Sequence, residues 1–305
     1  MDRRQFLTVA GATAAALSLD RSMAATLAQV HLGVTTDEIS EEIPVAAKFL
    51  KDMGLGWAEV RSVWGKYNTE QPLEKIKEIR STFDANGIKT SVLGTAFFRG
   101  QVPTTEAALD KEWKLLDAAF DRAEILGTDK LRTFGFLMKP GEAGDSGSIE
   151  KSLARIYELQ TEAGKRAKKR GMRLAIENLV GSYFAIGADS AKLLKNVKED
   201  AIGLTWDPNN AGMAGEKSYP DGYKLLDPKR IFHVHLRDWK HMPDGKVEWT
   251  FVGEGEFDNA GQIRSLLKTG YKDCFTLETH AKHPDGKMAA TKKSLLALLD
   301  VVKKV

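Results

Sequence analysis

The sequence predicts an α/β protein folded as a (β/α)8 TIM barrel. Short strings rich in β-branched and aromatic residues recur from residue 29 onward. Each is followed by a stretch with the three- and four-residue apolar spacing of an amphipathic helix. Eight such strand and helix units can be counted in the one chain. This pattern indicates a closed parallel barrel, with a doubly wound open sheet as the alternative.

The expected strands are separated by about the length of one βα unit with a variable loop. They cover residues 30–34, 57–60, 88–93, 130–134, 173–177, 202–207, 231–236 and 274–278. The clearest helices cover residues 44–53, 72–86, 106–126 and 149–170. Gly87, Gly127 and Gly171 follow the last three of these helices, and glycine there accepts the left-handed conformation that ends a helix.

The composition fits one globular domain. The chain has 305 residues, of which 42% are hydrophobic and 29% are charged, enough for a large core. No linker interrupts the pattern, so we expect a single barrel domain over residues 26–305. The formal net charge is only +3 and the basic residues are spread along helices, which argues against a nucleic-acid partner. The single cysteine, Cys274, lies in an apolar string and is expected to be a buried thiol.

The N-terminus has the pattern of an export signal. Arg3 and Arg4 precede a short apolar stretch over residues 9–19, and small residues follow at 22–25. This order resembles a twin-arginine signal, so we expect residues 1–25 to be a signal peptide and the protein to be exported to the periplasm. The apolar stretch is too short for a stable membrane span. The alternative to a signal peptide is an N-terminal membrane anchor.

Polar side chains follow the last four expected strands where each of them ends. In such a barrel these ends meet around one cavity. The residues are Glu177, Asp207, His235 and Glu278. Three carboxylates around one cavity raise one another's pKa, and a divalent cation removes that cost. Oxygen and nitrogen donors without sulfur suit Mn²⁺, the ion we expect, and also Mg²⁺, Co²⁺ or Zn²⁺.

Each of these residues also has a simpler explanation, because a strand-end Glu can serve as an ion-pair or capping residue and a strand His as a core residue. Among the histidines, His233 and His235 point to the same side of their strand. Only His235 is near enough to the carboxyl end to join the carboxylates, so we expect it to be the ligand. His233 then lies beneath it, as a supporting or substrate-binding group.

Three motifs around these positions carry a resemblance to a known family. They are Ile176-Glu177-Asn178, Trp206-Asp207-Pro208-Asn209 and the segment 233–238, His-Val-His-Leu-Arg-Asp. Together with the barrel pattern they resemble the xylose isomerase-like TIM-barrel superfamily of sugar phosphate isomerases and epimerases. The resemblance implies that Glu177, Asp207, His235 and Glu278 hold the metal. It also implies that Glu177 and Glu278 act as acid and base around a metal-stabilised enediolate.

On this basis we expect a metal-dependent sugar isomerase or epimerase that acts on a free sugar or keto-sugar. Asn210 stands where ketose epimerases carry a substrate-contacting histidine, which leaves the reaction open. The alternatives are a keto-glycoside lyase or deglycosidase with the same site, and a sugar-binding barrel without catalysis. A DNA-repair endonuclease of this superfamily would need extra histidines that the earlier strand ends lack. A homo-oligomer stays open.

Further substrate-binding candidates lie at or near the strand ends. Glu59, Arg61 and Arg132 either contact substrate or form ion pairs inside the barrel. Arg237 and Asn210 follow two of the expected ligands, and His280 is either a substrate contact and proton carrier or a loop residue. The loop aromatics Trp64, Phe97, Phe98 and Trp239 either stack on a sugar ring or pack over the barrel mouth.

Overall fold

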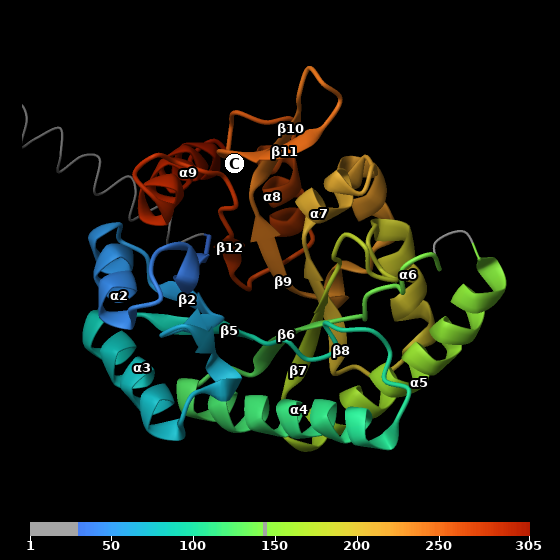
Figure 1. Cartoon of the computed structure of the whole chain (residues 1–305). Coiled ribbons are helices and arrows are strands. Elements are labelled where there is room, and N and C mark those ends of the chain that lie inside the picture. Colours follow the sequence, from blue (N-terminus) through green and yellow to red (C-terminus); the bar gives the residue numbers. More distant parts are fainter. Residues whose placement is uncertain (1–29, 143–144) are drawn as a thin grey trace, which may run out of the picture.

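The computed structural model describes residues 30–142 and 145–305 and confirms the predicted barrel (Figure 1). Eight parallel strands close in the order β1-β12-β9-β8-β7-β6-β5-β2. Their bounds are β1 Leu32–Thr35, β2 Trp57–Val60, β5 Lys89–Gly94, β6 Lys130–Phe134, β7 Arg173–Glu177, β8 Ile202–Trp206, β9 Ile231–Leu236 and β12 Phe275–Leu277. The expected signal peptide of residues 1–25 lies outside the described residues.

Helices surround the barrel and connect its strands (Figure 1). They are α2 Ile43–Asp52, α3 Leu73–Asn86, α4 Glu106–Leu126, α5 Ser146–Lys169, α6 Gly187–Asn196, α7 Pro208–Met213, α8 Asn259–Lys268 and α9 Lys287–Val302. Short helical turns add η1 Thr36–Glu38, η2 Asn68–Glu70, η3 Ser218–Gly222, η4 Tyr223–Leu225 and η5 Pro228–Arg230. No helix of the described chain is both long and apolar enough to cross a membrane.

Helix α4 shows how local sequence sets these elements. The Thr105 side chain accepts a hydrogen bond from the backbone N–H of Ala108 and so caps the N-terminus of the helix. Gly127 ends it in the left-handed conformation, with φ of 72°. The buried residues Leu116, Phe120 and Ala123 recur at helical spacing, which turns one face of α4 toward the strands.

Strand alternation separates the apolar and polar sides of the barrel wall. In β9, Val234 and Leu236 belong to the hydrophobic core, whereas His233 and His235 point the other way. Both imidazoles reach the Glu59 carboxylate of β2, which lies across the barrel interior. The barrel interior beneath the mouth therefore contains polar groups, and the apolar side chains of the wall pack outward against the helices.

Two hairpins extend from the βα loops at the mouth. The first pairs β3, Ser62–Val63, with β4, Lys66–Tyr67. The second pairs β10, Asp238–His241, with β11, Val247–Thr250, and projects from the barrel beyond β9 (Figure 1). Its Trp249 ring lies 4.5 Å from the Arg237 guanidinium, so this hairpin covers part of the mouth.

Candidate metal centre

The four expected ligands come together at the carboxyl ends of their strands. One ligand atom from each of Glu177, Asp207, His235 and Glu278 lies within 4.8 Å of the other three, and all four residues are buried. Glu177 is the last residue of β7, whereas Asp207 and Glu278 directly follow β8 and β12. His235 is the fifth residue of β9 and points inward from it.

The Nδ1 atom of His235 faces the three carboxylates. It lies 3.3 Å from Glu278 Oε2, 3.6 Å from Glu177 Oε1 and 3.9 Å from Asp207 Oδ2. Although it is buried, it has no hydrogen-bond partner among the described residues. A buried imidazole nitrogen without a partner, surrounded by carboxylate oxygens, fits a divalent cation with three oxygen ligands and one nitrogen ligand.

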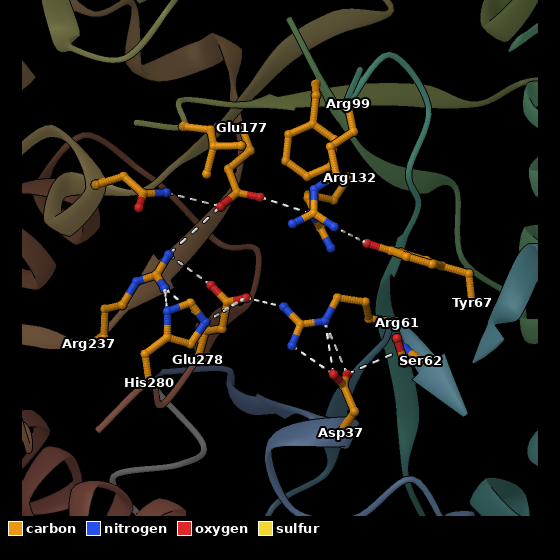
Figure 2. A pocket seen from close by; sticks show the side chains of 13 residues that line it. Asp37, Arg61, Ser62, Tyr67, Arg99, Arg132, Glu177, Arg237, Glu278 and His280 are labelled. Carbon is orange, nitrogen blue, oxygen red and sulfur yellow. Dashed lines mark hydrogen bonds and ion pairs between the residues drawn. The ribbon is translucent and has the colours of Figure 1, made fainter. Parts of the chain in front are cut away.

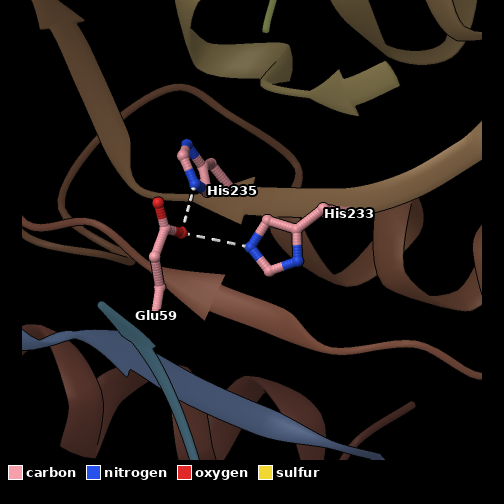
Figure 3. A group of neighbouring side chains, drawn as sticks. All are labelled: Glu59, His233 and His235. Carbon is pink, nitrogen blue, oxygen red and sulfur yellow. Dashed lines mark hydrogen bonds and ion pairs between the residues drawn. The ribbon is translucent and has the colours of Figure 1, made fainter. Parts of the chain in front are cut away.

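Glu59 orients His235 from below (Figure 3). Its Oε2 atom lies 2.8 Å from His235 Nε2 and 3.2 Å from His233 Nε2. Burial alone would raise the pKa of Glu59, but His235, His233 and Arg132 outweigh burial and hold that pKa well below its ordinary value. An ionised carboxylate only accepts hydrogen bonds, so both Nε2 atoms donate to it. Burial lowers the pKa of His235, but Glu59 and Glu278 outweigh it and raise that pKa well above its ordinary value. A metal ion would therefore displace a proton from Nδ1, the ring nitrogen directed at the candidate metal centre.

Asp207 uses its two carboxylate oxygens for two purposes. Oδ1 accepts hydrogen bonds of 2.9 Å from the backbone N–H groups of Asn209 and Asn210 and so caps helix α7. Oδ2 points to the candidate metal centre. Asn178 fixes the peptide backbone of Asp207, because its side chain donates to the Asp207 carbonyl and accepts from the Asp207 N–H, both at 2.8 Å. The end of β8 thus holds this ligand rigidly.

Arg237 places a positive charge among the carboxylates. Its Nη2 atom donates to Asp207 Oδ2 in a very short contact and lies 2.8 Å from Glu278 Oε2 and 3.8 Å from Glu177 Oε1. Burial lowers the pKa of Arg237, but Asp207 and Glu278 outweigh it and raise that pKa above its ordinary value. The guanidinium therefore neutralises part of the negative charge that a metal ion would also neutralise.

A cavity of about 380 Å³ opens above these groups (Figure 2). Its size falls in the range of small-molecule sites. It is lined by Asp37, Arg61, Ser62, Tyr67, Arg99, Arg132, Phe134, Glu177, Leu179, Asn210, Arg237, Glu278 and His280. Glu177 and Glu278 are the two members of the candidate metal group that line it, whereas Asp207 and His235 lie beneath. These two glutamates can therefore contact both a metal ion and a substrate.

The cavity holds five of the seven candidate substrate contacts, namely Arg61, Arg132, Asn210, Arg237 and His280. Asn210 donates to Glu177 Oε1 at 3.2 Å, and Arg132 Nη1 donates to Glu177 Oε2 at 3.0 Å. Arg61 pairs with Asp37, Glu38 and Glu278, and Nη1 of Arg237 lies 2.6 Å from Nδ1 of His280.

The other two candidates, Glu59 and His233, have no exposed surface and do not line the cavity. The sequence offered Glu59 as a substrate contact or an interior ion-pair residue, and His233 as a substrate-binding or supporting group. The structure places them below His235, because an inward-facing residue in the middle of a strand lies deeper in the barrel than one at its end. Glu59 contacts both imidazoles and lies 3.5 Å from the Arg132 guanidinium, so Glu59 and His233 support the groups around the candidate metal centre.

The two pocket glutamates are held as carboxylates. Burial raises the pKa of Glu177, but Arg132 and His235 outweigh it and the pKa falls below its ordinary value. Burial acts in the same way on Glu278, and Arg237, His235 and Arg61 hold its pKa well below the ordinary value. Both side chains are therefore acceptors at neutral pH, which suits metal binding and proton removal.

The chain matches the sequence profile of the xylose isomerase-like TIM barrel family over residues 47–300. The chain belongs to this family.

Among individual relatives of this xylose isomerase-like barrel, 3-dehydroshikimate dehydratase of Pseudomonas putida is 28% identical over 179 residues, which are 55% of this chain and 26% of the relative. The chain thus spans about a quarter of the length of that curated relative. Solved structures of other proteins also share the fold. The IOLI protein, crystallised with a zinc atom, has a TM-score of 0.72 and 18% identity, with 90% of this chain and 99% of that chain covered. D-Allulose 3-epimerase from Methylomonas sp., in complex with D-allulose, has a TM-score of 0.68 and 16% identity, with 90% and 94% covered.

Several cavity residues of this family member were missed from the sequence. Asp37 lies just beyond β1, so the rule that selected the later strand ends also applies to it. Tyr67 and Arg99 lie in βα loops, where periodicity gives no signal. The four loop aromatics proposed as sugar contacts do not line the cavity. Phe97 and Phe98 instead stack on each other with ring centroids 3.8 Å apart, fully buried.

Proposed function

We propose that this protein is a divalent-metal-dependent isomerase or epimerase of a sugar or keto-sugar. It would act by moving a proton at a carbon next to a carbonyl group. The observation that carries the proposal is that Glu177 and Glu278 belong to the candidate metal group and also line the cavity. A bound divalent cation would polarise the substrate carbonyl and stabilise the negative charge that forms on its oxygen.

The two glutamates are suited to opposite roles in this reaction. Strands β8 and β9 separate β7 from β12 in the barrel, so the two carboxylates enter the cavity from different directions. One would remove the proton, and the other, after taking a proton from solvent water, would return one to the substrate. Arg132 and Asn210 hold the Glu177 carboxylate, while Arg61 and Arg237 hold that of Glu278. These contacts fix both side chains relative to a bound substrate.

A second candidate function is a lyase that eliminates water or a glycosidic group. It is favoured by the similarity to 3-dehydroshikimate dehydratase. The first step would be the same proton removal, after which the C–O bond at the next carbon breaks and the leaving oxygen takes up a proton. His280 is the cavity group suited to supply that proton. Its side chain is 34% exposed, and Nη1 of Arg237 lies 2.6 Å from its Nδ1 and 3.2 Å from its Nε2. Because arginine only donates, the nearer Nδ1 accepts and Nε2 would carry the proton.

Both candidates are tested with purified protein loaded with Mn²⁺, Mg²⁺, Co²⁺ or Zn²⁺ in deuterated water. The panel comprises aldoses, ketoses, 3-keto-glycosides and 3-dehydroshikimate. Deuterium at the carbon next to the carbonyl of an isomerised product supports the isomerase or epimerase, and an unsaturated product supports the lyase. Glu177→Gln should abolish both outcomes. Turnover by this variant at the wild-type rate contradicts the role assigned to Glu177. If no substrate of the panel gives either product, proton transfer is contradicted as the function.

A further inference from the structure

The cavity contains one arginine whose charge is not neutralised by the protein. Four arginines line it, namely Arg61, Arg99, Arg132 and Arg237. Arg61 pairs with Asp37, Glu38 and Glu278, Arg132 with Glu177 and Glu59, and Arg237 with Asp207 and Glu278. Arg99 forms no ion pair within 4.0 Å with any residue that the structure describes. The three paired arginines are buried or partly buried and organise the glutamates, whereas Arg99 is exposed at the edge of the cavity and is available for a ligand.

Arg99 is nevertheless held in position. Its Nη1 donates a 2.7 Å hydrogen bond to the hydroxyl of Tyr67, and its guanidinium lies 5.7 Å from the Phe134 ring centroid. The Arg132 guanidinium lies 4.7 Å from the centroid of the same ring. Because the Tyr67 oxygen accepts from Arg99, its own O–H remains free to donate. The pair thus presents a cation and a neutral donor to the cavity.

We propose that Arg99 and Tyr67 form a subsite for an acidic group of the substrate, a carboxylate or a phosphate. The proposal rests on the function proposed above, because it names the class of substrate that the same cavity takes. A guanidinium offers paired N–H donors that match the two oxygens of such a group. A neutral sugar would leave this charge without a counter-charge in the complex.

The position of the subsite gives the substrate a direction. Figure 2 shows Arg99 and Tyr67 across the cavity from Arg237 and His280, which lie next to Glu278. The acidic group would therefore bind at one side while the carbonyl end lies at the glutamates. Both groups of the subsite come from βα loops of the first half of the barrel, and the candidate metal ligands come from the second half.

The test measures binding of ligand pairs that differ only in the acidic group. Suitable pairs are D-glucuronate with its methyl ester, 3-dehydroshikimate with its methyl ester, and D-glucose 6-phosphate with D-glucose. Dissociation constants are measured by calorimetry on Mg²⁺-loaded protein at low and high salt. We expect at least one acidic member to bind about 10- to 100-fold more tightly than its neutral partner, and salt to reduce this preference. A preference in the first two pairs indicates a carboxylate, and a preference in the third pair indicates a phosphate.

Variants assign the preference to these two residues. Arg99→Met should remove it while affinity for the neutral partner stays unchanged, and Arg99→Lys should restore part of it. Tyr67→Phe should weaken it less, because the charge remains. Arg264→Met on α8 is the matched control, since this exposed arginine lies outside the cavity. Melting temperatures verify that each variant is folded.

Equal affinity of the wild type for acidic and neutral members of all three pairs overturns the proposal. Equal losses in Arg99→Met and Arg264→Met, or equal losses for both members of a pair, also overturn it. The deuterium assay separates this failure from that of the proposed function. If binding depends on Arg99 but neither deuterium uptake nor elimination is seen, the subsite is supported and the proposed reaction is contradicted. If turnover is seen but does not depend on Arg99, the proposed reaction is supported and the subsite is contradicted.

Discussion

His235 donates its Nε2–H to Glu59 over 2.8 Å, and this contact joins β9 to β2 across the interior of the barrel. It directs the other ring nitrogen at the three carboxylates, so that Nδ1 carries the lone pair when the imidazole is neutral. Glu59 itself does not reach the cavity. It therefore acts on the candidate metal centre through the imidazole, and also through Arg132, which lies 3.5 Å from Glu59 and pairs with Glu177.

Glu59→Gln should accordingly weaken metal binding without removing a ligand. Supporting residues of this kind change metal affinity by about 10- to 100-fold. We expect a loss of that size for Mn²⁺ or Zn²⁺ in competition with a chromogenic chelator. Glu248→Gln, an exposed carboxylate on β11, provides the matched control. Wild-type affinity in the Glu59 variant would show that His235 needs no orienting partner.

Two substitutions of Asp207 separate its two roles. Asn at this position retains an oxygen that can accept from the N–H groups of α7, whereas Ala does not. Both should lose metal affinity. In the metal-free proteins, Asp207→Ala should be less stable than Asp207→Asn by about 1 kcal/mol, the usual cost of a lost N-cap. Urea unfolding measures this difference, and equal stabilities would mean that Oδ1 contributes nothing to the helix.

Removal of the metal should leave the barrel folded, because the Arg237 guanidinium lies among the carboxylates. We expect the same far-ultraviolet circular dichroism spectrum before and after chelation, and a melting temperature that rises as metal is added back. A thousandfold excess of metal over its Kd adds about 4 kcal/mol of stability. In Arg237→Met the metal-free protein should melt at a lower temperature, and the increase on metal addition should be larger. Unfolding of the wild type by a chelator alone would contradict this.

Cys274 should resist alkylation in the folded protein. Burial raises the pKa of its thiol to about 12, so the reactive thiolate is scarce at pH 8. Iodoacetamide followed by mass spectrometry should show little labelling at pH 8 and complete labelling in urea. The raised pKa also affects the free energy of unfolding. The contribution of this thiol to stability is fully present below the pKa of an unfolded thiol, about 8.5, and is lost as the pH rises from there through the folded pKa.

The N-terminal prediction concerns localisation. We propose that Arg3 and Arg4 direct export through the twin-arginine route, so replacing both with Lys should keep the protein in the cytoplasm. Cell fractionation with immunoblotting measures this in a host with that route. Arg155→Lys with Arg166→Lys on α5 is the control for the same chemical change elsewhere. Export of the double variant at the wild-type level would remove the assignment.

The strands were predictable where apolar strings end at turns. The bounds of β2, β6, β7 and β9 are those expected from the sequence, because each string fills its strand from end to end. The string at 202–207 was one residue too long, since Asp207 leaves the sheet to cap α7. Helix α5 begins at Ser146 and not at residue 149, because Asp145 caps it with its side chain and polar residues form its first turn.

In the candidate site, too, residues at strand ends were predictable and residues in loops were not. Strand ends have defined positions in a closed barrel, so Glu177, Asp207, His235 and Glu278 could be grouped from the sequence. Asp37 was missed, although it follows β1 in the same way. Tyr67 and Arg99 could not be placed, because loop paths depend on contacts between distant segments such as their own hydrogen bond.

The link between β2 and β9 also bears on the order in which this protein matures. All four candidate ligands lie between residues 177 and 278, so a truncated chain that lacks β1 and β2 would still contain the whole donor set. It would not contain Glu59, and nothing would then select the imidazole tautomer that favours coordination. Tight metal binding is therefore expected only when β2 has packed into the barrel opposite β9. We therefore expect a split version of the chain to bind metal tightly only after the piece that carries β2 has joined the piece that carries β9.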